Sequence, residues 1–161
     1  MTTIRAAVDD DRDAILSIIA PVLRAGETYA IDTDLSDEQI LDYWFMPAHA
    51  VFVADDSGKI LGTYYLMANQ RGGGKHVANC GYMVSPEAQG RGLAQAMCEH
   101  SQGIAKNRGF LAMQFNHVVS TNTRAVALWQ RLGFEIVGTL PKAFRHPVHG
   151  LVDSYVMFKT L

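Results

Sequence analysis

The stretch Gln89-Gly90-Arg91-Gly92-Leu93-Ala94 lies between an apolar run that ends at Val84 and a helix-patterned segment that continues through Ile104. This order predicts a strand, then a tight loop, then a helix. Two glycines let the backbone turn sharply, and the free N–H groups at a helix start point toward an anion. Arg91 adds a fixed positive charge. The stretch therefore predicts a phosphate-binding loop.

The loop alone leaves a second interpretation open. A helix follows a strand in every α/β protein, and most such turns bind nothing. The glycine spacing is neither GxGxxG nor GxxxxGK[ST], so the dinucleotide and nucleoside-triphosphatase signatures are absent. A second glycine-rich segment, Arg71 to Lys75, favours a surface connection over another phosphate site, because no helix is predicted after it.

Length and composition predict one domain over residues 1–161, with enough apolar side chains (48%) for a sizeable core. The 14 basic and 16 acidic residues are spread along the chain, and the formal net charge is −2. Neither a nucleic-acid surface nor a membrane-binding patch is predicted. Cys80 and Cys98 form no CxxC pair, and no apolar run is long enough to span a membrane. We expect a cytoplasmic protein with a small-molecule partner.

Apolar periodicity and turn residues divide the chain into alternating strands and helices. The predicted strands are residues 3–8, 50–54, 59–68, 76–84, 111–118, 134–140 and 151–158, and the last two are joined by a loop. Four helices are predicted: one between Asp9–Asp11 and Gly26, which Pro21 should kink or divide, then residues 36–44, 90–107 and 122–132. The first two either form a wall of a substrate site or only cover the core. The order predicts an α/β (α+β) fold with a mixed sheet of about seven strands.

The loop matches the Q/R-x-x-G-x-G/A signature of the GNAT superfamily of N-acetyltransferases, which the chain resembles over nearly its whole length. Asn122-(x2)-Ala125-(x3)-Trp129-(x3)-Gly133-Phe134 is similar to the family's Asn…Ala…Tyr…Gly-Phe segment. The resemblance implies a mostly antiparallel sheet whose central parallel pair splays apart to admit the pantetheine arm of acetyl-CoA. It implies acetyl-CoA as co-substrate and no metal.

The family's cofactor site can be carried over residue by residue. It comprises strand amides, the phosphate loop and two residues of the next helix: Met83, Val84, Gln89, Gly90, Arg91, Gly92, Leu93, Ala94, Asn122 and Trp129. Asn122 would hold the pantetheine through its side-chain amide, or else it is only a helix N-cap. A backbone N–H near Met83 would donate to the thioester oxygen. Trp129 replaces the tyrosine that protonates the thiolate in the family, and an indole N–H is a donor but no workable acid at neutral pH.

The general base is not evident from the sequence. Residues 79–82 offer no carboxylate where relatives often place a glutamate on this strand. His76 and His117 are the nearest titratable candidates. A lone histidine is more often a surface or structural residue, so a chain of water molecules is favoured as the route for the proton.

Segments 79–82, 115–122, 128–129 and 137–141 resemble more closely the fungal N-acetyltransferases of proline analogues such as azetidine-2-carboxylate, which also carry Trp in place of Tyr. In those enzymes amide side chains crowd the acceptor site, and the matching catalytic positions are Asn79 and Asn116. Amides can donate to a substrate carboxylate or orient a neutral imine nitrogen without adding negative charge. The alternative is that Asn79 and Asn116 pair with each other across neighbouring strands as structural hydrogen bonds.

The expected function is transfer of an acetyl group from acetyl-CoA to the amine of a small molecule, an amino or imino acid such as a proline analogue, by direct attack in a ternary complex. Two alternatives are acetylation of an antibiotic, a polyamine or a protein N-terminus, and a non-catalytic domain that senses acyl-CoA. Near-neutral charge argues against polyamines. His146, His149 and Asp153 do not suffice for a metal site. A homodimer through the last two strands is a possible assembly.

Overall fold

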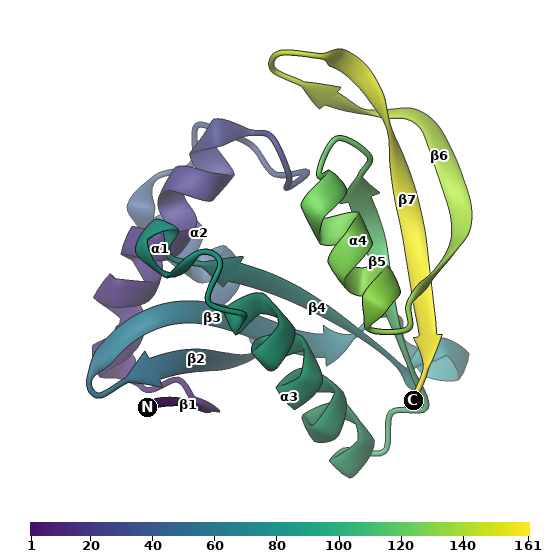
Figure 1. The fold of residues 1–161 in the computed structure, drawn as a ribbon. Coiled ribbons are helices and arrows are strands. Elements are labelled where there is room, and N and C mark those ends of the chain that lie inside the picture. The colour runs from purple at the N-terminus through teal and green to yellow at the C-terminus, as the bar shows by residue number, and fades with distance from the viewer.

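A seven-stranded sheet runs through the computed structural model, which describes residues 1–161, in the order β1-β2-β3-β4-β5-β7-β6 (Figure 1). The strands are β1 (Thr2–Ala6), β2 (Ala50–Asp56), β3 (Lys59–Ala68), β4 (Val77–Val84), β5 (Ala112–Val119), β6 (Glu135–His146) and β7 (Gly150–Thr160). The helices are α1 (Arg12–Ala25), α2 (Asp37–Trp44), α3 (Leu93–Asn107) and α4 (Thr123–Arg131). All neighbouring strands are antiparallel except β4 and β5, so the predicted mixed sheet and four helices are confirmed.

Two hydrophobic clusters cover the opposite faces of the sheet. Alternate side chains of a strand point to opposite faces, and the neighbours Tyr64 and Tyr65 accordingly belong to different clusters. One cluster packs α1 and α2 around Trp44, and the other packs α3 and α4 around Met97 and Trp129. Each helix pair therefore fixes one face of the central strands.

The helix signals in the sequence are confirmed except at Pro21. Ser36 and Gln39 form the predicted capping box of α2: the Gln39 N–H donates to the Ser36 hydroxyl at 3.2 Å, and the Ser36 N–H donates to the Gln39 side-chain oxygen at 2.9 Å. The sequence predicts that Pro21 kinks or divides the first helix, and it does not divide it, because α1 continues through Pro21. Pro21 and Ser17 are both exposed, so the Ser17 carbonyl that loses its helical partner faces water.

The predicted end of the sixth strand at Leu140 is also wrong. β6 continues to His146, and a register shift against β7 between Leu140 and Phe144 accommodates Pro141 and Lys142. Lys142 has a φ of 53°, and its N–H donates to Asp153 at 2.9 Å. The proline lies in a β-bulge of an edge strand, where no ladder donor is needed, and it does not end the strand.

Candidate functional site

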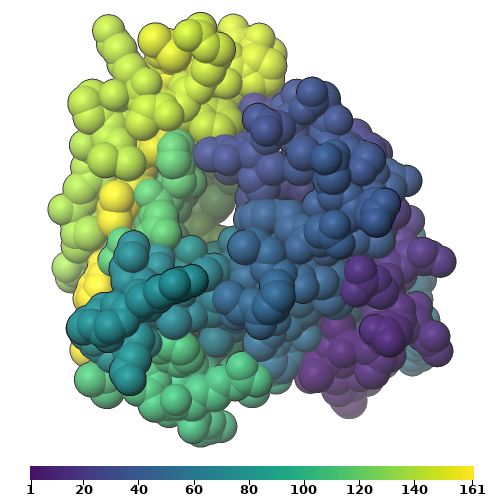
Figure 2. Space-filling view, turned by 180° about the vertical axis from the view of Figure 1, so that it is seen from behind, coloured from purple at the N-terminus to yellow at the C-terminus, as the bar shows by residue number.

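The central strands β4 and β5 are joined at one end only. Their register contains two pairs, Val77 with Ala112 and Ala78 with Met113, and the strands then diverge (Figure 1). Seen from behind, the surface is hollowed between the yellow-green C-terminal hairpin and the blue segments around α2 (Figure 2). The divergence exposes the edge of β4 from residue 79 onward.

Strand geometry decides which backbone groups of β4 face the gap. The β3–β4 ladder is bracketed by two hydrogen bonds, Asn69 N–H to Val77 O and Ser85 N–H to Leu61 O, both at 2.8 Å. Alternate residues of an antiparallel strand direct their N–H and C=O groups to the same side. The odd-numbered residues of β4 therefore pair with β3, and the even-numbered ones face the gap.

Met83 pairs with Thr63 of β3, so its amide does not face the gap. Its side chain is 4% exposed and packs in the cluster of α1 and α2. The free strand amides lie instead at Tyr82 and Val84. The amides that face the gap therefore lie one residue to either side of Met83, because successive backbone N–H groups of a strand point to opposite sides.

The loop after β4 presents free N–H groups at the start of α3. Gly90 and Gly92 have φ values of 78° and 77°, in the left-handed region that favours glycine. The N–H groups from Gly92 to Gln95 have no backbone partner, as expected for the first turn of a helix. They border a cleft of about 430 Å³, here called the α3 cleft, lined among others by Gln89, Gly90, Gly92, Leu93, Ala94, Gln95, Asn122, Arg124, Leu128, Trp129 and Arg131. The cleft has the properties of an anion site.

Arg91, the cation that the sequence predicts for this loop, lies beside a surface carboxylate. The Arg91 guanidinium lies 3.4 Å from the Asp56 carboxylate, and Arg91 does not line the α3 cleft. Arg124 and Arg131 of α4 do. Our reading of the sequence missed them, although their seven-residue spacing on a helix that begins after Asn122 puts both on one face.

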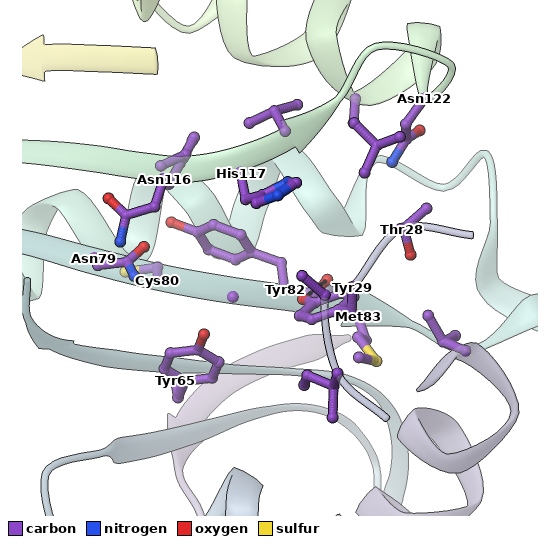
Figure 3. Close-up of a pocket in the computed structure, with 18 of the residues that line it drawn as sticks. Thr28, Tyr29, Tyr65, Asn79, Cys80, Tyr82, Met83, Asn116, His117 and Asn122 are labelled. Carbon is purple, nitrogen blue, oxygen red and sulfur yellow. Dashed lines mark hydrogen bonds between the residues drawn. The ribbon is translucent and has the colours of Figure 1, made fainter. Parts of the chain in front are cut away.

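A second cavity of about 420 Å³, here called the splay cavity, lies where β4 and β5 diverge (Figure 3). It shares six residues with the α3 cleft: Tyr82, Val84, Gln89, Asn122, Ala125 and Trp129. The two spaces therefore form one channel along the open edge of β4. The remaining wall of the splay cavity comes from α1, α2 and the segment between them, and from β3, β4 and β5.

Asn122 lies where the two spaces meet (Figure 3). It occupies the N-cap position of α4, yet its side chain makes no capping hydrogen bond. The alternative of a simple N-cap is therefore wrong, and the amide is free toward the channel. Trp129 is 9% exposed and packs against Phe115, with ring centroids 5.0 Å apart, so it belongs to the core as well as to the channel wall.

Asn79 and Asn116 both line the splay cavity (Figure 3). The Asn116 amide donates to the Asn69 side-chain oxygen at 2.6 Å and accepts from the Gln114 side chain at 2.9 Å. The orientation of the Asn116 side chain is therefore fixed by Asn69 and Gln114. It is not fixed by the alternative, a direct hydrogen bond to Asn79.

His117 lines the same cavity because β5 is irregular at this point. A register shift between Phe115 and Val118 brings Asn116 and His117 together in a bulge, and bulges commonly redirect side chains at functional sites. The His117 ring contacts Phe144 edge to face, with centroids 5.8 Å apart, and its Nδ1 is buried with no hydrogen-bond partner. His76 is exposed and does not line the cavity.

Tyrosine hydroxyls supply much of the polarity of the splay cavity, and our reading of the sequence did not assign them. The Tyr29 hydroxyl donates to the Tyr82 carbonyl at 3.2 Å, and the hydroxyls of Tyr43 and Tyr65 lie 3.2 Å apart. Burial raises the pKa of Tyr29, Tyr43 and Tyr65 above the ordinary value. All three stay protonated at neutral pH. They come from three separate elements, so no local pattern announces them.

No Asp, Glu, Lys or Arg lines the splay cavity. Burial also raises the pKa of the Cys80 thiol to about 12, so this group is neutral as well. No group of three His, Cys, Asp or Glu side chains is arranged to hold a metal ion. His146 instead accepts the N–H groups of Val148 and His149 at its Nδ1, which closes the turn between β6 and β7.

An anion cleft joined along an open strand edge to a neutral cavity fits a long ligand with phosphates at one end and a reactive group at the other. These features define a transferase that uses an acyl-coenzyme A. The model of the acetyltransferase (GNAT) family matches residues 16–134. The chain belongs to the GNAT family and is an acetyl-CoA-dependent acyltransferase, as predicted.

Solved structures support this assignment. The chain superposes on a GCN5-related N-acetyltransferase from Kribbella flavida with a TM-score of 0.94 and 44% identity, over 99% of this chain and 98% of that one. A phosphinothricin acetyltransferase from Sinorhizobium meliloti in complex with acetyl-CoA gives a TM-score of 0.86 at 25% identity, over 99% of this chain and 88% of that one. No helix here is long and apolar enough to cross a membrane.

Relatives by sequence carry different names. The N-acetyltransferase aca1 of Schizosaccharomyces pombe is 28% identical over 151 residues, which cover 83% of this chain and 72% of that enzyme. A mycothiol acetyltransferase of an Arthrobacter species is 36% identical over 93 residues, which cover 56% of this chain and only 28% of that enzyme. The family is shared, and only the second name refers to a particular small molecule.

Proposed function

We propose that this protein acetylates the nitrogen of a small amino or imino acid, such as a proline analogue, in a ternary complex formed within one domain of residues 1–161. The observation that carries the proposal is the single channel from the α3 cleft to a splay cavity lined by amides and hydroxyls and by no charged residue. Acetyl-CoA supplies an acetyl group activated as a thioester.

The α3 cleft is suited to the phosphates of acetyl-CoA. The loop from Gln89 to Ala94 would offer N–H groups to the diphosphate, and Arg124 and Arg131 would offer charge. Asn122 and the edge of β4 at Val84 would hold the extended arm through amide hydrogen bonds. The Tyr82 N–H faces the gap and would donate to the thioester oxygen, which stabilises the charge that develops there.

The splay cavity favours a small acceptor over a polycation. A polyamine or a cationic antibiotic requires carboxylates to offset its charge, and none lines this cavity. Asn79 and Asn116 would hold the acceptor through neutral donors and acceptors. The similarity to the N-acetyltransferase aca1, which covers 72% of that enzyme, supports transfer to a nitrogen and leaves the class of acceptor to the lining of the cavity.

The proposal can be tested by measuring free thiol released from acetyl-CoA with azetidine-2-carboxylate, L-proline, glycine, L-methionine, spermidine and a peptide N-terminus as acceptors. We expect turnover with the small amino or imino acids and little with spermidine. Binding of coenzyme A without turnover of any acceptor, or a clear preference for spermidine or the peptide, would contradict it.

Asn116→Ala tests the acceptor site directly. Loss of one hydrogen bond to a charged group costs about 1.5–3 kcal/mol, so we expect KM for the acceptor to rise about tenfold or more while Kd for coenzyme A changes little. Asn107→Ala, at the exposed end of α3, is the matched control. An effect on coenzyme A larger than the effect on the acceptor would refute this role.

The homodimer and the cytoplasmic location stay predictions.

A further inference from the structure

The proposed acetyl transfer leaves a proton on the acceptor nitrogen and an electron pair on the departing sulfur, and the splay cavity lacks the glutamate and the tyrosine that the family resemblance associates with these two steps. No carboxylate lines it, and Trp129 stands where the family resemblance expects a tyrosine. A cavity without charged side chains also stabilises poorly any step that creates a charge on the protein. A proton path that keeps every protein group neutral fits this environment.

One hydroxyl reaches the open edge of β4. Tyr29, in the α1–α2 connection, donates to the carbonyl oxygen of Tyr82 at 3.2 Å. Tyr82 is an even-numbered residue of β4, so that carbonyl faces the gap in which the extended arm would lie. The Tyr29 hydroxyl is thereby held beside the Tyr82 N–H, the proposed donor to the thioester oxygen. Figure 3 shows Tyr29 and Tyr82 next to each other.

The other tyrosine hydroxyls of the cavity are engaged elsewhere. Tyr82 turns its own hydroxyl to the far face of the sheet, where it lies 2.6 Å from Ser101 Oγ. Tyr43 and Tyr65 bond to each other. The Tyr29 contact, like that between Tyr43 and Tyr65, is longer than the usual 2.5–3.0 Å of an O–H···O bond. Since the Tyr29 hydroxyl proton points at Tyr82, the oxygen lone pairs of Tyr29 remain available to an N–H of the acceptor.

We infer that Tyr29 is the catalytic residue that relays the proton from the acceptor nitrogen to the departing sulfur. This inference rests on the proposed function. The lone pair of the neutral amine forms the C–N bond to the acetyl carbon, and the C–S bond breaks with its electrons on sulfur. The amine proton passes to the Tyr29 oxygen as the Tyr29 hydroxyl proton passes to sulfur. The products are the amide and the free thiol, and Tyr29 ends unchanged.

The electrostatics of Tyr29 agree with this role. Burial is the main cause of its raised pKa, and the neighbouring Tyr43 raises it further. Such a phenol neither ionises to act as a base nor persists as a phenolate after acting as an acid. A concerted relay requires neither state. The ionisable groups facing it from the adjoining elements are Tyr43, Tyr65, Cys80 and His117, and none of them is a carboxylate or a permanent cation.

The first test is Tyr29→Phe, with Tyr155→Phe as the matched control that removes a tyrosine hydroxyl outside both cavities. The acceptor is the best one among azetidine-2-carboxylate, L-proline, glycine and L-methionine. Since positioned proton transfer contributes about 10²–10⁴-fold, we expect kcat to fall at least 100-fold in Tyr29→Phe and to stay within twofold in Tyr155→Phe. Kd for coenzyme A, measured by calorimetry, should stay within twofold in both variants, which also reports that they fold.

The second test uses the unaltered protein. Single-turnover rates in mixtures of H2O and D2O should fall with a bowed dependence on the deuterium fraction, because two protons move in one step. The rate should rise with pH in proportion to the neutral fraction of the amine. A linear deuterium dependence, or Tyr29→Phe within threefold of the unaltered kcat, would overturn the relay. A large loss in His117→Asn with Tyr29→Phe unaffected would also overturn it in favour of His117. In each of these cases the unaltered protein still acetylates the acceptor, so failure of the Tyr29 relay can be distinguished from failure of the proposed function.

Discussion

The α3 cleft and the splay cavity are almost equal in volume, about 430 and about 420 Å³, but they are built differently. The cleft takes its polarity from consecutive backbone N–H groups at one helix start and from two arginines of α4. The splay cavity takes its polarity from side chains of several elements and contains no charged residue. A ligand end that is always an anion can be bound by the backbone, whereas a variable acceptor must be bound by side chains that can change.

The different roles of the two cavities can be tested first at the α3 cleft, where Gly92→Glu has the largest expected effect. A residue other than glycine at a φ of 77° costs about 1–2 kcal/mol of stability, and the new carboxylate repels a diphosphate. We expect Kd for coenzyme A, measured by calorimetry, to rise about 100-fold or more.

Gly72→Glu is the matched control for that change. Gly72 also has a positive φ, 54°, and at both glycines an added Cβ meets no atom within 4 Å. The two variants should lose similar thermal stability, whereas only Gly92→Glu should lose coenzyme A. Equal affinity in the two variants would remove the loop from the cofactor site.

The different construction of the two cavities also explains which site residues could be predicted from the sequence. The loop is local: six consecutive residues, two of them glycines that adopt left-handed conformations, predict an anion site from their order along the chain alone. Asn122 could also be placed, because it opens the next helix. Tyr29, Tyr43 and Tyr65 could not be assigned, since their approach depends on how α1 and α2 pack on the sheet. The choice between Met83 and its neighbours depends on which side of β4 pairs with β3, and this is a property of register.

Gly81→Ala should disturb the splay cavity and leave the cleft intact. A Cβ at Gly81 would lie 2.5 Å from Cε2 of Tyr65, and the Tyr65 ring cannot easily move because it stacks on His49 with centroids 3.9 Å apart. Overpacking of this kind costs about 1–3 kcal/mol. We expect a lower Tm and a KM for the acceptor raised about tenfold, in line with the displacement of Tyr65 and its hydroxyl.

Gly103→Ala is the control for this second change. Gly103 lies in α3 with no atom within 4 Å of an added Cβ, so alanine should stabilise the protein by about 0.5–1 kcal/mol. Kd for coenzyme A should be unchanged in both variants, because the Gly81 backbone faces β3 rather than the gap. A weakened affinity for coenzyme A in Gly81→Ala, with an unchanged KM for the acceptor, would contradict the separation of the two ends.

Arg124→Ala tests which arginine supplies charge to the cleft. Hydrogen bonds to charged groups contribute about 1.5–3 kcal/mol, so we expect Kd for coenzyme A to rise about tenfold at low salt and less at high salt. Arg91→Ala should change it less than twofold, because Arg91 is paired with Asp56 on the surface and such pairs are worth about 0–1 kcal/mol. Isothermal titration at two salt concentrations decides between them, and the reverse ranking would restore Arg91 as the phosphate ligand.

Asn122→Ala has the smallest expected effect and separates binding from stability. The Asn122 side chain does not cap α4, so its removal should leave the free energy of unfolding unchanged. Loss of one neutral hydrogen bond to the pantetheine costs about 1 kcal/mol, so Kd for coenzyme A should rise about fivefold.

Ser36→Ala is the matched opposite case, because the Ser36 hydroxyl caps α2 at 3.2 Å and lies outside the channel. It should lower the free energy of unfolding by about 1 kcal/mol without changing Kd. Denaturant unfolding and calorimetry on the two variants measure both quantities, and a loss of stability in Asn122→Ala with unchanged affinity would return Asn122 to a purely structural role.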